Sequence, residues 1–203
     1  MRPPRAAAVI VAGAVLAVGC AGGGSAASRD APPRVVRVSV AVDGLVPQVA
    51  TGVATGDGCV VTVAHALTGG RTVAVAGRRA RVVRVDRRLD LALLSVPGLR
   101  APAVRLGGDA RRVGIPVFRD HRRRTLQAGI RRRVLVHWRD QPGDRPQPRP
   151  GIEVAARIDP GDSGAPVVDR RGRVLGVLYA RSSDAAGTAW AVDASAVRRL
   201  LAR

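Results

Sequence analysis

The sequence has few aromatic residues and no lysine. Aromatic side chains make up 2% of its 203 residues, and all 34 basic residues are arginine. Because large rings are scarce, valine, alanine, leucine and isoleucine must fill the interior, and valine dominates the segments with strand patterning. With 46% hydrophobic residues the chain can build one substantial core or two small ones, and its composition favours a β-rich fold.

Acidic residues are outnumbered by basic ones. The formal net charge is +19 at pH 7, and a surface this basic can attract nucleic acid or anionic lipid. The arginines are scattered and no aromatic residues are interleaved with them, so compositional bias explains the charge better. Clusters at 122–124 and 131–133 could touch lipid headgroups or nucleic acid, but a solvated face is the simpler interpretation. We expect no nucleic-acid partner.

Cysteine and histidine are also scarce. The two cysteines, Cys20 and Cys59, are far apart, and so are the three histidines. This spacing does not match a set of metal ligands, so we expect no metal and no cofactor. Cys20 ends a targeting segment, and Cys59 lies in an apolar run as a small buried residue, so we expect no disulfide.

No hydrophobic run is long enough to cross a bilayer comfortably, but residues 1–20 have the pattern of a signal peptide. Arg2 and Arg5 precede an uncharged stretch over 6–18. The segment ends in Leu-Ala-Val-Gly-Cys, which resembles a bacterial lipobox and implies lipidation at Cys20. The protein is therefore expected to be exported and held on the outer face of the bacterial cell membrane as a lipoprotein. Ordinary cleavage with secretion, and retention of the segment as an anchor, are the alternatives.

One folded unit is expected after the targeting segment. Residues 21–33 are rich in Gly, Ala, Ser and Pro and predict a flexible linker, so the folded domain covers 34–203, divided into 34–105 and 106–203. Strand patterns separated by turn residues fill both parts. In the first part they cover 35–42, 49–55, 59–64, 72–75, 80–85 and 91–96. In the second part they cover 115–118, 125–130, 134–139, 152–155, 165–168, 174–179 and 189–192, and a helix follows at 193–201.

Two sets of about six strands followed by a short helix predict an all-β fold of two six-stranded antiparallel barrels. Closing each set removes exposed sheet edges. A cleft between two barrels is a natural place for an active site. The stretch 139–151, with four prolines, is expected to be a polar loop.

Three segments carry residues with catalytic potential. Ser163 lies in the turn Asp-Pro-Gly-Asp-Ser-Gly-Ala-Pro, His65 follows Val-Thr-Val-Ala, and Asp90 stands before Leu-Ala-Leu-Leu. Serine is a weak nucleophile that needs a base to take its proton, and imidazole can do this near neutral pH. A carboxylate can fix the imidazole tautomer and stabilise its cationic form. The sequence therefore predicts a triad of His65, Asp90 and Ser163.

The glycine turn around Ser163 also predicts an oxyanion hole. Glycine permits backbone angles that aim N–H groups into a common space. The amides of Gly161 and Ser163 could then hold the anion of a tetrahedral intermediate, which implies acyl transfer to water. The order His, Asp, Ser differs from that of α/β-hydrolases and subtilisins, and Ala165 breaks the G-x-S-x-G pattern of α/β-hydrolases.

These motifs resemble the trypsin-like serine proteases of chymotrypsin fold, and most closely the bacterial HtrA/Deg-type protease domain without a PDZ domain. The family shows T-x-x-H, x-D-L-A-L-L and P-G-[ND]-S-G-x-P, which correspond here to 62–65, 89–94 and 160–166. The resemblance covers roughly 35–200, and the stretch 111–151 matches poorly. It implies an exported serine endopeptidase that acts on protein or peptide substrates.

The resemblance also assigns roles to individual residues. It implies His65 as general base, Asp90 as orienting acid and Ser163 as nucleophile. Ile158 falls at the wall of the pocket for the P1 side chain, which suggests small or apolar P1 residues. Arg157 falls near the position that sets charge preference, so it would favour acidic P1 residues if it pointed inward, but a solvent-facing arginine is favoured.

Other residues compete for these roles. Asp86 precedes two arginines and is expected on an exposed turn, and His121 and His137 are expected in a basic loop and a strand. In pancreatic-type relatives the residue matching Asp162 pairs with a new N-terminus after zymogen cleavage, a switch we do not expect here. An inactive binding module on the same fold is the main alternative function, and a serine esterase is a second.

Overall fold

The computed structural model describes residues 32–43, 46–119, 122–138, 147–183 and 185–202. The predicted signal peptide with Cys20, and almost all of the predicted linker, lie outside the described residues. His121 does as well. Among the helices of the described part, none is long and apolar enough to cross a membrane.

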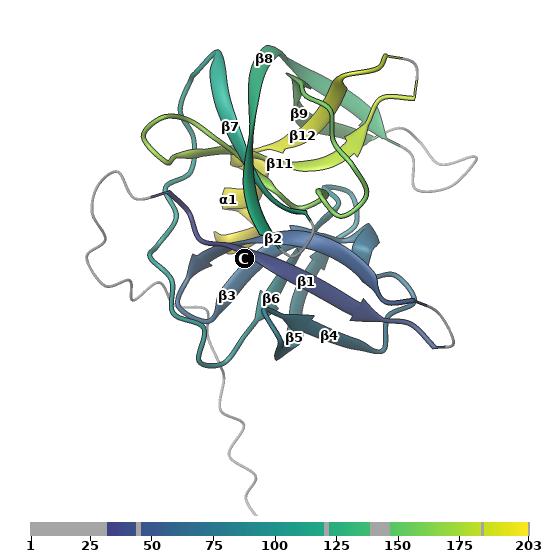
Figure 1. Ribbon diagram of the computed structural model, residues 1–203. Helices are drawn as coiled ribbons and strands as arrows, with labels where there is room; N and C mark the ends of the chain where they lie inside the picture. The colour runs from purple at the N-terminus through teal and green to yellow at the C-terminus, as the bar shows by residue number, and fades with distance from the viewer. Residues whose placement is uncertain (1–31, 44–45, 120–121, 139–146, 184, 203) are drawn as a thin grey trace, which may run out of the picture.

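The first half of the described chain forms a closed barrel, the lower lobe of Figure 1. Its neighbouring strands run in the order β1-β2-β3-β6-β5-β4, and antiparallel pairing of β1 with β4 closes the ring. Valine, alanine and leucine fill its interior. The six strands are β1 (Val35–Ala41), β2 (Gln48–Gly56), β3 (Cys59–Val63), β4 (Thr72–Val75), β5 (Arg78–Asp86) and β6 (Leu91–Ser95). A single 3-10 turn, η1 (His65–Leu67), follows β3.

The second half forms another six-strand ring, the upper lobe of Figure 1, in the order β10-β11-β12-β9-β8-β7. A single pair of opposed residues, Val168 and Gly114, closes it between β10 and β7. The strands are β7 (Arg112–Arg119), β8 (Arg122–Trp138), β9 (Gln147–Ala155), β10 (Pro166–Val168), β11 (Val174–Arg181) and β12 (Thr188–Asp193). The predicted two-barrel fold is therefore confirmed.

Helix α1 (Ala194–Ala202) ends the described chain and joins the two lobes. It contacts β11 and β12 of the second barrel and β6 of the first. Its buried face, with Val197 and Leu200, belongs to the same hydrophobic cluster as the interior of the first barrel. The helix thus extends one core across the junction, where Figure 1 shows it between the lobes.

Two details of the second barrel differ from the sequence-based expectation. The strands expected at 125–130 and 134–139 are one long strand, β8, whose register shifts between Ile130 and Arg132. This irregularity breaks the alternation of side chains and makes one strand look like two. In addition, β9 begins at Gln147, inside the stretch expected to be a loop. Its prolines are tolerated because 147–150 pair with β8 alone, whereas pairing with β12 starts at Gly151.

Cys59 is 6% exposed, as expected for a small buried residue at the start of β3. The structure describes it as disulfide-bonded, so the expectation of no disulfide is wrong. That expectation depended on assigning the chain's other cysteine, Cys20, to the targeting segment alone.

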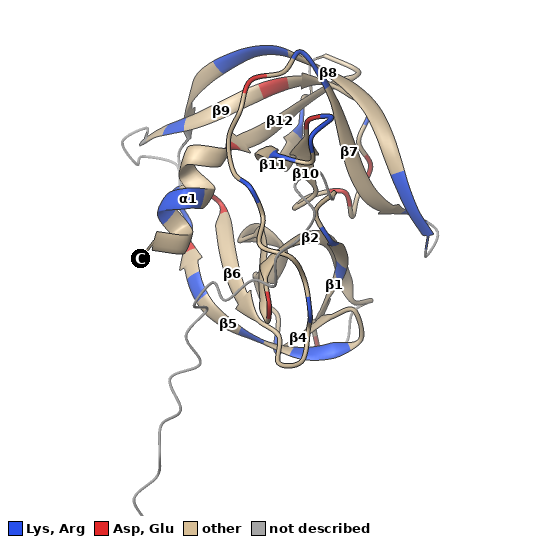
Figure 2. Cartoon of the chain, turned by 90° about the vertical axis from the view of Figure 1, so that its left-hand side faces the viewer, with Lys and Arg blue, Asp and Glu red and all other residues tan. Residues whose placement is uncertain are grey.

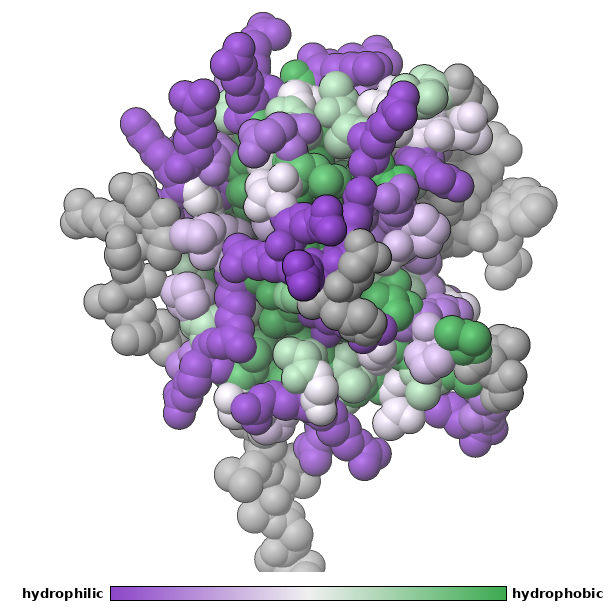
Figure 3. All heavy atoms as spheres, in the orientation of Figure 1, coloured by the Kyte–Doolittle hydropathy of each residue, from purple (hydrophilic) through white to green (hydrophobic). Residues whose placement is uncertain are grey.

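The arginines are scattered over the surface, as expected. Figure 2 shows basic residues on strands of both barrels, and Figure 3 shows hydrophilic side chains projecting around the outline.

Candidate active site

Asp90 lies at the last position of the turn that joins β5 to β6, on the first barrel. Its φ of 54° is in the left-handed region, which a residue with a side chain rarely adopts. Its N–H donates to the carbonyl of Arg87 over 3.2 Å. The competing carboxylate of Asp86 accepts from the N–H of Leu89 over 3.0 Å, so it supports the same turn from within.

The structure brings His65 and Asp90 together, as the sequence predicted. The His65 Nδ1 lies 2.7 Å from Asp90 Oδ2, and the His65 backbone N–H donates to Asp90 Oδ1 over 2.9 Å. The N–H of Ala64 donates to the Asp90 carbonyl over 3.1 Å. The histidine side chain is 50% exposed and the carboxylate 14%. A carboxylate held at both oxygens fixes the ring, and Nε2 is then the nitrogen available for proton transfer.

The turn that carries Ser163 belongs to the second barrel but is docked on the first. The N–H of Thr51 in β2 donates to the Ser163 carbonyl over 2.8 Å, and the Thr51 hydroxyl donates to the Gly161 carbonyl over 2.8 Å. Thr62 in β3 donates its hydroxyl to the Thr51 carbonyl over 2.8 Å. Because His65 follows β3, these bonds couple the histidine and serine segments across the junction of the two barrels.

Close packing at this junction requires glycine at position 164. Gly164 has a φ of 88°, and a Cβ added there would lie 1.9 Å from the Thr51 carbonyl oxygen. Sequence reasoning saw Gly164 only as part of a motif and gave Thr51 and Thr62 no role. Their buried hydroxyls in valine-rich strands were the available signal, because a buried hydroxyl needs a partner.

The amides of the serine turn differ in how they are used. Those of Asp162, Gly164 and Ala165 donate to the carbonyls of Asp159, Leu178 and Asp162, respectively. Within the described part of the chain, the amides of Gly161 and Ser163 have no acceptor. Gly161 has a φ of 96°, the kind of angle that lets adjacent N–H groups converge. The two amides left over are those expected to form an oxyanion hole.

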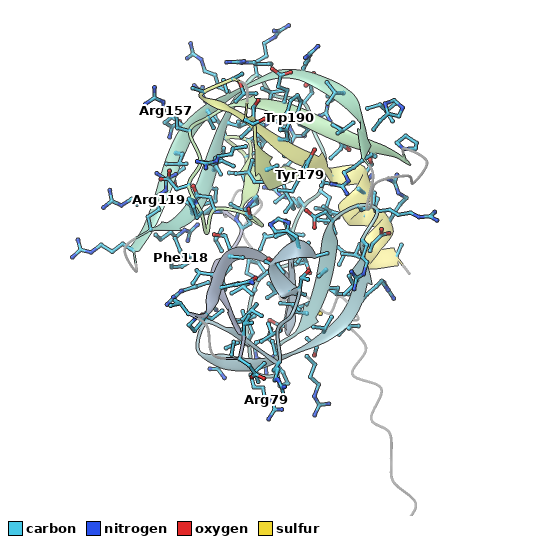
Figure 4. All side chains as sticks on the ribbon, turned by 90° about the vertical axis from the view of Figure 1, so that its right-hand side faces the viewer. Arg79, Phe118, Arg119, Arg157, Tyr179 and Trp190 are labelled. Atoms are coloured by element: carbon cyan, nitrogen blue, oxygen red, sulfur yellow. The ribbon has the colours of Figure 1, made fainter. Side chains whose placement is uncertain are left out.

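The Ser163 hydroxyl makes no hydrogen bond to any described residue, so the predicted serine–histidine bond is not formed in this structure. Bonds of this kind tighten in many enzymes only when substrate is bound. Ile158 is 7% exposed and packs in the core of the second barrel. Arg157 is exposed and points outward at the edge of Figure 4, in agreement with the solvent-facing alternative.

Arg119, at the end of β7, holds the segment that leads to Ser163. Its Nη2 lies 2.5 Å from Asp162 Oδ2, and its Nη1 lies 2.8 Å from Asp159 Oδ2. A third contact joins Nη2 to the Arg157 carbonyl at 3.3 Å. The Asp162 side chain is 1% exposed, and it also accepts the N–H of Asp159. Sequence reasoning did not assign Arg119, since nothing local distinguishes it from the other arginines.

No group of three or more His, Cys, Asp or Glu side chains in the described ranges has a geometry that could hold a metal. His137 is exposed on β8. The groups with catalytic potential that the structure places at the junction of the barrels include His65, Asp90, the Ser163 hydroxyl and the amides beside it.

Two six-strand barrels, with a His–Asp pair on one and a Gly-Asp-Ser-Gly turn on the other, define the chymotrypsin-like class of serine protease fold. The chain belongs to the trypsin-like peptidase domain family, whose model matches residues 50–177.

Named relatives agree with this assignment. Serine protease Rv3671c of Mycobacterium tuberculosis is 33% identical over 156 residues, which cover 71% of this chain and 39% of the relative. A probable periplasmic serine endoprotease, DegP-like, of Ectopseudomonas mendocina is 35% identical over 124 residues, or 56% of this chain and 24% of the relative. The chain thus spans well under half the length of these relatives.

Solved structures show the same fold. The active form of the Rv3671c protease superposes with a TM-score of 0.76 at 28% identity, covering 84% of this chain and 80% of that one. The HtrA-type protease AlgW with a tripeptide gives a TM-score of 0.69 at 23% identity, covering 85% of this chain and 60% of that one. At this lower identity, the similarity to AlgW shows only that the two proteins share a fold.

Proposed function

We propose that the protein is a serine endopeptidase in which Ser163 attacks the carbonyl carbon of a peptide bond. His65 takes the serine proton through Nε2, and Asp90 holds the ring by Nδ1 and stabilises the imidazolium. The oxyanion is bound by the amides of Gly161 and Ser163. His65 then returns the proton to the leaving amine, and water hydrolyses the acyl-enzyme by the same steps. The observation that carries the proposal is the pair of contacts between Asp90 and His65, one to Nδ1 of the ring and one to the backbone N–H.

The test of this proposal is Ser163→Ala in the full chain. The variant should keep its melting temperature and lose peptide hydrolysis, since a methyl group cannot form the acyl-enzyme. Labelling of the wild-type protein by a fluorophosphonate probe, lost in the variant, would separate a protease from an inactive binding module. Unchanged turnover in the variant would overturn the proposal, and a folded wild-type protein that resists the probe would favour the binding module.

The P1 preference follows from the segment before Ser163. Arg157 points away from the molecule, and Ile158 beside it is apolar and buried. We therefore propose small or apolar P1 side chains rather than acidic ones. Cleavage of a peptide library by the purified domain tests this. Enrichment of Asp or Glu at P1, abolished by Arg157→Ala, would reverse the assignment.

We also propose that residues 1–20 direct export, and that in a lipidated form of the protein Cys20 would carry a lipid on the outer face of the membrane while Cys59 is a free thiol. DegP-like relatives are named as periplasmic, which supports export. Since the chain has one other cysteine, a disulfide at Cys59 within the chain and a thioether lipid on Cys20 exclude each other. Intact mass of the mature protein decides between them: a diacylglycerol adduct with a free Cys59 supports the lipoprotein, and an unlipidated, oxidised chain refutes it.

A further inference from the structure

Arg149 in β9 is a buried arginine with a relative exposure of 1%, in a chain whose other arginines are mostly at the surface. Moving a guanidinium out of water is costly unless hydrogen bonds and other charges compensate. The contacts of Arg149 therefore identify the groups that compensate for burying its charge.

The guanidinium crosses from the second barrel to the first. Its Nε donates to the carbonyl of Arg88 over 2.7 Å, and its Nη2 lies 3.4 Å from the carbonyl of Arg87. These are the carbonyls of the turn that presents Asp90. The Arg87 carbonyl also accepts the Asp90 N–H, so Arg149 and Asp90 share one acceptor.

The same cation rests against Tyr179 of β11. The Arg149 Cζ lies 5.0 Å from the centroid of the Tyr179 ring, and Tyr179 is 7% exposed. Burial raises the pKa of the Tyr179 phenol, the charge of Arg149 and a hydrogen bond from it oppose that rise, and the charge of Asp90 adds to it. The charges of Arg149 and Asp90 thus both act on the phenol. Figure 4 shows Tyr179 on the part of the upper lobe that faces the lower one.

Asp90 needs such support. Its φ of 54° is unfavourable for a residue with a side chain, and a strained turn persists only where surrounding contacts determine its shape. Within the turn, the Leu89 N–H donates to the Asp86 carboxylate and the Asp90 N–H donates to the Arg87 carbonyl. From outside the turn, the Ala64 N–H of the first barrel holds the Asp90 carbonyl, and Arg149 adds its bonds from the barrel that also carries Ser163.

We infer that Arg149 is a positioning residue for the catalytic carboxylate: it fixes the 87–90 turn from the opposite barrel and so sets where Asp90 holds His65. This inference rests on the proposed triad. Catalysis of this kind depends on ångström-scale placement, and a displacement of about 1 Å can cost about 100-fold in rate. A loose 87–90 turn would affect the step that transfers the proton more than substrate binding.

The primary test is Arg149→Met in the full chain, which keeps most of the volume and removes the donors. We expect kcat to fall about 10- to 100-fold while KM changes less than about 3-fold. Arg149→Lys should recover part of kcat, because an ammonium can still donate to the two carbonyls, though without the planar fork of arginine. Arg132→Met is the matched control, because Arg132 pairs with Glu153 on the same two strands but does not reach the turn.

A double-mutant cycle with Asp90→Asn separates positioning from general destabilisation. If Arg149 acts through Asp90, then Arg149→Met lowers kcat by at most about 3-fold in the Asp90→Asn background. An equal loss in both backgrounds would overturn the inference, as would parental kcat in Arg149→Met. If Arg149→Met does not fold, the same cycle is read with Arg149→Lys.

Ser163→Ala, measured in parallel, keeps the two proposals apart. Retained turnover in Ser163→Ala would refute the proposed function. Loss of turnover in Ser163→Ala together with parental kcat in both Arg149 variants would refute the positioning role alone.

Discussion

Arg119 and Asp162, the residue before Ser163 in the serine turn, form an ion pair with Nη2 and Oδ2 2.5 Å apart and the carboxylate 1% exposed. A buried carboxylate at this place needs a cation. Here the guanidinium of Arg119, a side chain of β7, supplies it. The same guanidinium reaches Asp159 and the Arg157 carbonyl, so one residue ties together the segment that leads to the oxyanion hole.

Arg119→Ala should therefore lower kcat about 10- to 100-fold, because the amides of Gly161 and Ser163 would no longer be held in place. Breaking a buried pair also destabilises the fold, by about 3 kcal/mol. Steady-state kinetics on a peptide substrate and thermal unfolding measure the two effects. Guanidinium ion at non-denaturing concentration should restore part of the activity.

The matched control for Arg119→Ala is Arg173→Ala. Arg173 pairs with Asp169 at 2.6 Å, and that carboxylate side chain is 5% exposed. The pair lies in the turn between β10 and β11, so its loss should lower the melting temperature with little change in kcat. Equal kcat losses in both variants would show that Arg119 acts through stability alone.

Asp90→Asn tests the carboxylate of the triad directly. Asparagine keeps the shape, but its NH₂ group can favour the wrong tautomer of His65, and the equivalent change in a serine protease triad lowers kcat about 10,000-fold. We expect a loss of that order with near-parental folding. Asp86→Asn is the comparison, since the Asp86 carboxylate supports the same turn by accepting the N–H of Leu89. A larger kcat loss in Asp86→Asn than in Asp90→Asn would show that Asp86, and not Asp90, is the carboxylate of the triad.

The sequence was sufficient to predict the architecture because the signals for it are local. Valine-rich runs and glycine turns specify short strands, and two sets of them with a final helix leave few closed arrangements. The His65–Asp90 contact was predictable for a related reason: each residue stands at the end of a strongly apolar strand. His65 follows β3 and Asp90 precedes β6, and these two strands pair with Val63 opposite Leu91. The pairing of the strands is therefore enough to place the two residues near each other.

Two of the residues that sequence reasoning missed act across the junction of the two barrels. Thr51 and Arg149 make their important bonds to residues more than 60 positions away. Arg149 also lies among prolines, a composition typical of a loop, and only its pairing with β8 makes it part of a strand. Local patterns carry no information about such contacts, because these contacts depend on how the two barrels pack against each other.

Gly164→Ala should disrupt the contact between the barrels. An added Cβ would lie 1.9 Å from the Thr51 carbonyl oxygen and 2.7 Å from the Thr62 hydroxyl, and the residue has a φ of 88°. Overpacking and an unfavourable backbone angle together predict a loss of about 3 kcal/mol or more, with loss of turnover. Gly129→Ala is the control, because the nearest atom to its added Cβ is 3.6 Å away. Chemical denaturation of both variants measures the difference.

The ion pairs of Glu153 predict that the stability of the fold decreases at acidic pH. A hydrogen bond from Arg132 is the largest cause that holds its pKa below the ordinary value of 4.5, and Arg131 acts in the same direction against the effect of burial. A lowered pKa in the folded state means that Glu153 stabilises the fold fully above about pH 4.5, and that this contribution is lost as the pH falls through the lowered value. Glu153→Gln should therefore be less stable than the parent at neutral pH, by melting temperature, and the gap should close as the pH is lowered below 4.5. A gap that stays constant down to the lowest pH at which both proteins fold would contradict the ion-pair explanation.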